Sequence, residues 1–325
     1  MSKLYKGLLI AISMITGIVI GPAAWAQGWP TRPISLMVGF APGGGTDVTA
    51  RLFAQKLTSV LGQPVIVENR PGAAGNIAAE NVVKAAPDGY HILMIASGTF
   101  INNVLTSRPR YSVTKDLAPI SFVTISPLVL VAGPTVKARS VPELLEEIRA
   151  KPKKFTYSGD GVGGTQQLTG ELFSSMTGAK LLFVPFKGSS DATAAVAAGQ
   201  VDISFPSTTA AAPLLQSGKV RALAVTSAHR SSLLPDVPTL SELGLSGFDV
   251  VGWFALMGPN GLPRPIIDKI NSALAEVARQ PDVKEALGKQ GLEVQLNSPE
   301  EFAVYLREQA SIISKVAKDA NIKID

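Results

Sequence analysis

The residues best suited to chemistry in this sequence form a glycine-rich stretch, Gly39–Asp47, which contains three consecutive glycines. An apolar run, Ile34–Val38, precedes it and predicts a buried strand, and apolar residues at helical spacing follow it. The glycines therefore lie where a strand passes into a helix. There they let N–H groups of the loop and of the first helical turn point outwards, at the positive end of the helix dipole. This arrangement suits an anion. The alternative, a glycine-rich turn that binds nothing, stays open for this loop alone.

Two more strand ends in the first part of the chain carry small and polar residues. The stretch Glu68–Asn76 follows a second predicted strand, and Ser97 and Thr99 follow a third, at 91–95. The carboxyl ends of parallel strands lie at one edge of a sheet, which is where ligands bind in such folds. We therefore expect these segments to lie beside the first loop.

A similar pattern restarts in the middle of the chain with Gly159–Gly164, which fits the dinucleotide fingerprint GxGxxG. That fingerprint requires an acidic residue at the end of the next strand, about 20 residues further on. The next strand here ends in Phe186 and Lys187 instead. The stretch therefore indicates a second loop for a small anion, and we expect no cofactor.

Covalent catalysis and metal binding have little support in the residue types. The chain has no cysteine, no GxSxG motif and only two histidines, His91 and His229, in unrelated segments. A catalytic triad needs a serine and an acid that converge on the histidine, and a transition-metal site needs histidine or cysteine at close spacing. We predict neither catalytic residues nor a metal site. The polar loops can donate hydrogen bonds, as expected of a protein that binds a small anion.

Composition and the amino-terminal segment limit the classes of protein to which this chain can belong. The 325 residues carry a formal net charge of +5, and no dense run of lysine and arginine with aromatic residues occurs, so we expect no nucleic-acid binding. Residues 1–26 have a positive start, an apolar run too short to span a membrane and small residues before position 27. This pattern predicts a signal peptide cleaved after Ala26 and export of the mature chain. Without cysteine, that chain has neither a disulfide nor a lipid-anchoring residue.

Strands and helices alternate along the mature chain, which predicts an α/β fold with two domains. We place the first domain at 27–127 and 251–325 and the second at 128–250. A strand near 250–257 brings the chain back to the first domain, and the last helix, from about 299 to 320, lies across its outside. We expect a monomer.

In chain order, these motifs resemble the tripartite tricarboxylate transporter substrate-binding family, the Bug-type periplasmic receptors of bacteria. A series of motifs is more specific than any one of them, and the similarity covers essentially the whole mature chain. The matching segments are 40–47 with Ala50-Arg51, 67–77, 85–90, 184–188, 199–202, 221–225 and 234–239.

The resemblance implies a Venus-flytrap fold, in which each domain is a mostly parallel sheet flanked by helices and the ligand lies between the domains. It implies capture of a small carboxylate, namely a dicarboxylate, tricarboxylate, aromatic acid or amino acid. Membrane permease subunits of a tripartite tricarboxylate-type transporter, or a sensor protein, are the implied partners. In the first domain the family's ligand contacts match Phe40, Ala41, Gly43, Gly44, Gly75 and Asn76, with Ser97 and Thr99 as further contacts. In the second domain they match Ser158, Gly163, Gly164, Thr165, Lys187 and Asp202.

Three charged residues allow two interpretations each. Asp47 either contacts the ligand or caps N–H groups at the start of a helix. Asp202 either accepts a hydrogen bond from the ligand or closes a turn, and Lys187 either pairs with a carboxylate or is a solvated surface lysine. A rival function is a periplasmic hydrolase or isomerase that uses Asp47 or Asp202 as a base. Where the family often has His-Leu, this chain has Gln167-Leu168, which leaves the specificity of the second domain open.

Overall fold

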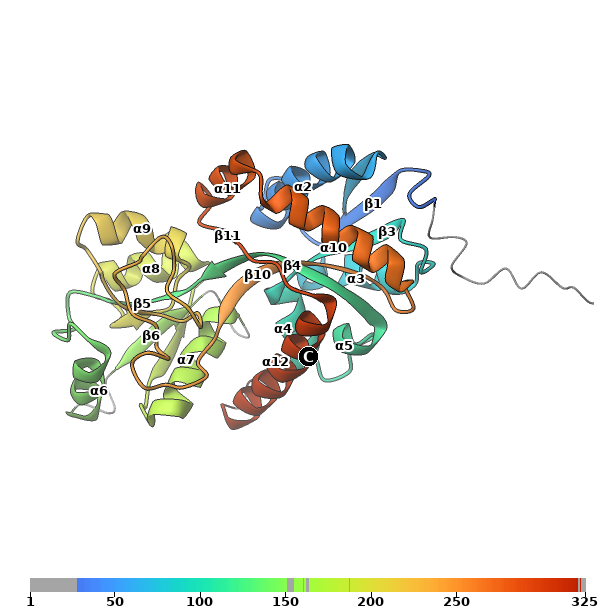
Figure 1. Ribbon diagram of the computed structural model, residues 1–325. Helices are drawn as coiled ribbons and strands as arrows, with labels where there is room; N and C mark the ends of the chain where they lie inside the picture. The colour runs from blue at the N-terminus through green and yellow to red at the C-terminus, as the bar shows by residue number, and fades with distance from the viewer. Residues whose placement is uncertain are drawn as a thin grey trace, which may run out of the picture.

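The computed structural model describes residues 28–150, 155–159, 161, 164–186, 188–320 and 322. The predicted signal peptide, Gly163 and Lys187 lie outside these residues. The described residues form two lobes, each built around one sheet with helices packed on it, which confirms the predicted α/β fold (Figure 1). No helix in the described ranges is long and apolar enough to cross a bilayer.

Lobe 1 contains a six-stranded sheet in the order β11-β4-β10-β3-β1-β2. β1 pairs in parallel with β2 and β3, whereas β10 pairs antiparallel with β3 and β4. The carboxyl ends of β1, β2 and β3 therefore lie at one edge. The strands are β1 (Ile34–Val38), β2 (Val65–Asn69), β3 (His91–Ala96), β4 (Leu117–Pro127), β10 (Val251–Pro259) and β11 (Glu293–Val294).

Helices cover both faces of this sheet, and for that reason all five residues of β1 are buried. The core on one face includes residues of α2, α10 and α11, and the core on the other includes residues of α3, α4 and α12. The helices of lobe 1 are α2 (Gly45–Leu61), α3 (Asn76–Val83), α4 (Ser97–Leu105), α5 (Val113–Asp116), α10 (Arg264–Ala278), α11 (Pro281–Gly288) and α12 (Pro299–Asp319), with a short 3₁₀ turn, η2 (Ala73–Gly75).

Lobe 2 contains a five-stranded sheet in the order β7-β6-β8-β5-β9. β6 pairs in parallel with β7 and β8, so their carboxyl ends also share an edge. Its strands are β5 (Val129–Ala132), β6 (Thr156–Gly159), β7 (Leu182–Pro185), β8 (Ile203–Ser204) and β9 (Arg221–Val225). Its helices are α6 (Val141–Ala150), α7 (Thr165–Thr177), α8 (Ser189–Ala197) and α9 (Thr208–Gln216).

The chain passes between the lobes twice. It leaves lobe 1 where β4 leads through Leu128 into β5, and it returns where the segment after β9 enters β10. Figure 1 shows β4 and β10 side by side at this junction, with α12 below them, and the two strands pair along most of their length. The junction is therefore a two-stranded connection that carries both crossings.

An aromatic cluster fixes α12 on the sheet beside this junction. Phe302 is fully buried, with its ring 4.7 Å from that of Phe122 and 5.9 Å from that of Trp253. The helix starts at a capping box, in which Ser298 accepts from the Glu301 N–H and the Glu301 carboxylate accepts in return from the Ser298 N–H. Cap and cluster together set where α12 begins and which face it buries.

Phe302→Ala should lower the free energy of unfolding by about 3–5 kcal/mol, because it removes a buried ring and leaves a cavity between Phe122 and Trp253. Urea unfolding followed by circular dichroism measures this loss. Val304→Ala, at a partly exposed position of the same helix, is the control and should change stability by no more than about 0.5 kcal/mol. Equal losses in the two variants would contradict this account of the cluster.

Candidate functional site

Three consecutive strand ends of lobe 1 meet through glycine. A side-chain Cβ on Gly39, after β1, would overlap the Cα of Gly75 and lie 2.7 Å from its carbonyl oxygen. A Cβ on Gly75, after β2, would overlap the Thr99 hydroxyl and lie 3.3 Å from the ring of Phe40. The expected meeting of these segments is therefore observed, and it is possible only because two of the contacting residues have no side chain.

The first loop leaves backbone donors accessible at the start of α2. Gly44 is the N-cap of this helix and provides no side-chain hydrogen bond, so the first turn keeps N–H groups without an intrahelical partner. Gly43 has a φ of +85°, which favours glycine, and residues 41–45 are exposed. The N–H groups of Gly43 and Gly44 bond to Asp47 and to the Ala41 carbonyl oxygen, so the accessible donors are those of the first turn of α2. Such a helix start attracts an anion.

The Asp47 side chain, which is only 2% exposed, supports this loop through hydrogen bonds. Its Oδ2 accepts hydrogen bonds from the Gly43 N–H (2.8 Å) and from Arg51 Nε (3.0 Å). Its Oδ1 accepts from Asn69 Nδ2 (2.8 Å), which also donates to the Phe40 carbonyl oxygen (3.0 Å). Asp47 therefore supports a loop N–H and connects the loop to the end of β2, while Gly44 is the residue that occupies the cap position of α2.

The charge state of Asp47 follows from these contacts. Burial by itself raises the pKa of this carboxyl group. The hydrogen bonds from Arg51, Gly43 and Asn69, together with the positive charge of Arg51, outweigh burial and hold the pKa below its ordinary value of 3.8. Asp47 is therefore ionised at neutral pH and bound within the protein.

The second loop is strained. Gly72, Ala73, Ala74 and Gly75 have φ values of +127°, +48°, +53° and +91°, so four successive residues take left-handed conformations, two of them with side chains. Such backbone persists only where surrounding structure holds it, and it is concentrated at functional sites. The Asn76 side chain donates to the Ala73 carbonyl oxygen at 2.7 Å, so this predicted ligand contact supports the loop.

The start of α7 in lobe 2 repeats the geometry of the start of α2 in lobe 1. Gly164, the N-cap of α7, has φ and ψ of −73° and 163°, and Gly44 has −75° and 164°. The Gly164 N–H donates to the Gly161 carbonyl oxygen (3.3 Å), just as Gly44 donates to Ala41 (3.4 Å). Neither cap uses a side chain. Thr165 then begins α7, so both lobes present an uncapped helix start at the carboxyl edge of a sheet.

Two predicted contacts of lobe 2 use their side chains within the lobe. Ser158 is fully buried and its hydroxyl donates to the Ala192 carbonyl oxygen (2.9 Å) within the lobe. The Asp202 carboxylate accepts from the Thr156 N–H (2.8 Å), the Thr156 hydroxyl (2.9 Å) and the Thr135 hydroxyl (3.1 Å). Thr156 begins β6, whereas the loop follows its end, so Asp202 lies at the opposite end of the strand. This position favours the turn-closing interpretation of Asp202.

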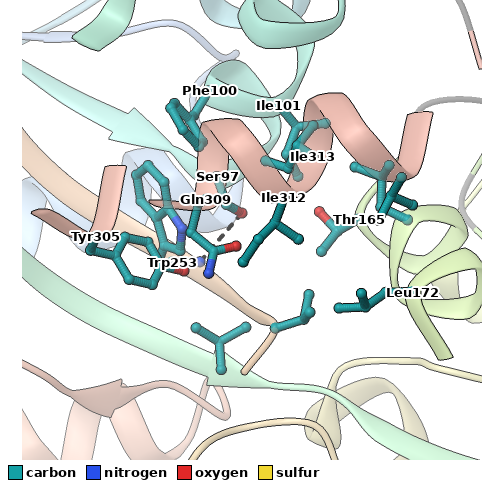
Figure 2. Close-up of a pocket in the computed structure, with 14 residues that line it drawn as sticks. Ser97, Phe100, Ile101, Thr165, Leu172, Trp253, Tyr305, Gln309, Ile312 and Ile313 are labelled. Carbon is teal, nitrogen blue, oxygen red and sulfur yellow. Dashed lines mark hydrogen bonds between the residues drawn. The ribbon is translucent and has the colours of Figure 1, made fainter. Parts of the chain in front are cut away.

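A pocket lies between the lobes, with Ser97 and Thr165 among its lining residues (Figure 2). Ser97 and Thr99 belong to the first turn of α4, so this one turn reaches both the pocket and Gly75. The Ser97 hydroxyl accepts from the Trp253 N–H at 3.3 Å. The pocket has a water-accessible volume of about 40 Å³. Its wall is mostly apolar and includes Phe100, Ile101, Leu168, Leu172, Trp253, Ile312 and Ile313.

Sequence reasoning missed the contribution of α12 to this pocket. Gln309 and Ile312 line it together with Thr165, and Figure 2 shows Gln309 and Thr165 around the same space. The only sequence signal is the amphipathic spacing of the helix, which does not identify the lobe that the apolar face meets. No group of three or more histidine, cysteine, aspartate or glutamate residues in the described ranges is arranged to hold a metal ion.

Gly39→Ala should destabilise the protein by about 1–3 kcal/mol, because the new methyl group displaces the backbone of Gly75. The melting temperature measures the loss. Gly288→Ala is the matched control, since a Cβ there meets no atom within 4 Å. A Gly39→Ala melting temperature equal to that of Gly288→Ala would show that the two loops are not in contact.

Acid should remove the stabilisation that ionised Asp47 provides. Because the folded pKa lies below the unfolded value of 3.8, this stabilisation is fully present above pH 3.8 and is lost as the pH falls through the folded pKa. Urea unfolding of wild type and Asp47→Asn should therefore differ most near pH 5 and converge at lower pH. A difference that stays constant between pH 5 and pH 2.5 would exclude this role of the carboxylate.

Comparison with known proteins identifies the family. The model of the tripartite tricarboxylate transporter family receptor matches residues 49–322. BugT of Bordetella pertussis is 35% identical over 318 residues, which are 97% of each chain. The structure of R. palustris Rpa4515 with adipate has a TM-score of 0.71 and 33% identity, over 91% of this chain and 99% of that one. MatC of Rhodopseudomonas palustris with bound malate has a TM-score of 0.67 and 32% identity, over 89% and 99%. The resemblance and the two-lobed α/β fold class are thus confirmed, although both sheets are mixed rather than mostly parallel. The chain belongs to the tripartite tricarboxylate transporter receptor family.

Proposed function

We propose that the protein is a periplasmic receptor that binds a small dicarboxylate between its lobes. The observation that carries this proposal is the set of uncapped helix starts, α2 and α4 in lobe 1 and α7 in lobe 2, with the pocket between Ser97 and Thr165. Helix starts and exposed main-chain N–H groups bind carboxylates. The structures of two relatives contain adipate and malate, which are both dicarboxylates, and this supports the ligand class.

One carboxylate of the ligand would bind at the lobe 1 loops. Phe40, Ala41, Gly43, Gly44 and Gly75 would form this end, with Ser97 and Thr99 beside it. Gly163, Gly164, Thr165 and Lys187 would receive the distal end. Asp47, Asn76, Ser158 and Asp202 are left out as direct contacts, because their side chains bond within the protein. The apolar wall of the pocket suits the hydrocarbon part of such a ligand.

The two lobes would act as domains, 27–127 with 251–325 and 128–250, which close on the ligand by a hinge at the paired crossings. Released from its signal peptide after Ala26, the receptor would work as a monomer. It would present the ligand to the permease subunits of a tripartite tricarboxylate-type transporter or to a sensor protein.

Catalysis is the rival function, with Asp47 or Asp202 as a base. Asp47 is bound by three donors and has a lowered pKa, so it accepts a proton poorly at neutral pH. Asp202 is bonded to Thr156 and Thr135 inside lobe 2. Both carboxylates accept hydrogen bonds within the protein, and this supports a receptor that returns its ligand unchanged.

Thermal-shift measurements with malate, adipate, citrate, benzoate and glutamate test the ligand class. A ligand at 100 times its dissociation constant should stabilise the protein by about 2.7 kcal/mol. The protein should be unfolded and refolded first, to remove any co-purified ligand, and mass spectrometry should recover the bound acid intact. Conversion of the acid would favour the enzyme, and no shift with any of the five would count against the proposal.

Gly44→Val should weaken binding of the best acid in this panel at least tenfold, because the new side chain covers N–H donors at the start of α2 and a hydrogen bond to a charged group is worth about 1.5–3 kcal/mol. The fold should hold, since Gly44 has an ordinary extended backbone and its Cβ would come no closer than 3.5 Å to the Ala41 carbonyl oxygen. Isothermal titration calorimetry measures the change.

Gly28→Val is the control for this variant. Gly28 precedes Trp29, which packs on Tyr90 at the other end of β3 from the loops. The control should bind as wild type does. Equal affinities of Gly44→Val and Gly28→Val would remove the first loop from the binding site.

A further inference from the structure

We propose that Tyr111 and Asn102 are positioning residues, which hold the strained loop Gly72–Gly75 in its binding conformation through the side chain of Asn76. The inference rests on the proposed function, in which Gly75 contributes to the carboxylate site. Neither residue belongs to a motif found in the sequence, and neither lies at the pocket between the lobes.

The Asn76 amide is fixed by three hydrogen bonds. Its Nδ2 donates to the Ala73 carbonyl oxygen (2.7 Å) and to Asn102 Oδ1 (2.8 Å), and its Oδ1 accepts from the Tyr111 hydroxyl (2.7 Å). Both amide protons and the oxygen are therefore used, which defines the orientation of the group. Tyr111 and Asn102 thus orient the Asn76 side chain so that one of its N–H groups bonds to the carbonyl oxygen of Ala73.

Tyr111 is itself held firmly. It is 6% exposed, and its carbonyl oxygen accepts from Asn103 Nδ2 at 2.9 Å. Asn103 Oδ1 in turn accepts from the Val113 N–H at 3.1 Å. Burial, with the negative charge of Glu80, raises the pKa of Tyr111 well above its usual value, so the phenol keeps the proton that it donates. The support of the loop is therefore continuous from Val113 to Ala73.

Packing holds only one end of the loop, where Gly75 lies against Gly39 and Thr99, so the rest of the loop needs this support. Ala73 and Ala74 are exposed and have positive φ, which L residues adopt at a cost. A groove with a water-accessible volume of about 520 Å³ lies on this side of the loop. It is lined in part by Ala73, Asn76, Asn102 and Tyr111. Because this face of the loop borders open space, its conformation there is held by hydrogen bonds.

Tyr111→Phe removes one hydroxyl group and keeps the ring. Hydrogen exchange followed by mass spectrometry, in the ligand-free protein, should show at least tenfold faster exchange in residues 72–76, with the rest of lobe 1 unchanged. Affinity for the tightest binder among malate and adipate should fall about five- to tenfold, as expected for one lost hydrogen bond. Tyr90→Phe is the matched control, because its hydroxyl bonds to Thr31 at the other end of β3.

Two further variants separate positioning from general stability. Asn102→Asp keeps the oxygen that accepts from Asn76 and should bind within about twofold of wild type, whereas Asn102→Leu should lose affinity as Tyr111→Phe does. Glycine adopts positive φ freely. Adding Ala74→Gly to Tyr111→Phe should therefore restore at least half of the lost affinity, because the loop then needs less support.

Each outcome decides the proposal. Unchanged exchange in Tyr111→Phe, exchange that rises throughout lobe 1 with a fall in melting temperature, or no rescue by Ala74→Gly would overturn it. If wild type binds neither malate nor adipate, the proposed function loses its support. The exchange data then still decide whether Tyr111 holds the loop.

Discussion

The architecture of lobe 1 depends on one close approach of main chain to main chain, between Gly39 and Gly75. Any side chain at either position would force the loops after β1 and β2 apart. With glycine at both, the backbones meet, and Thr99 at the start of α4 completes the contact. The three strand–loop–helix units built on the parallel strands β1, β2 and β3 therefore converge at one edge, where their N–H groups can act on a single anion.

Buried polar groups rather than apolar packing give these loops their shape. The ionised Asp47 side chain holds the Gly43 N–H, and Asn69 bonds to both Asp47 and Phe40. Donors from Arg51 and Asn69 offset the cost of burying this charge, as the lowered pKa indicates. The Asp47 carboxylate is hydrogen-bonded within the protein. The groups left to face a ligand are therefore main-chain N–H groups, which carry no negative charge. Such a site is organised before an acid arrives.

The sequence was sufficient to place the loops, because glycine marks positions where a chain must turn tightly and a strand pattern shows where each loop begins. It predicted the restart of the pattern in lobe 2, where Gly164 repeats the geometry of Gly44. It was not sufficient to orient side chains. Asn76 and Ser158 lie in the predicted segments, but their side chains bond to other groups of the protein, and Asp202 lies at the end of β6 opposite the loop. Spacing along a strand gives no information on which hydrogen bond a polar side chain will choose.

The contribution of α12 could not be predicted for a different reason. Gln309 and Ile312 are close to Thr165 only because two paired crossings bring lobe 2 against a helix that lies more than a hundred residues away in the sequence. The loops that we propose as the carboxylate sites are local in sequence and repeat between the lobes, whereas the wall of the pocket combines α4, α7, β10 and α12. On this proposal, charge recognition is encoded in short motifs that relatives can share. The shape that would separate one acid from another then depends on how the two lobes meet, and substitutions in α12 can change it while every motif stays intact.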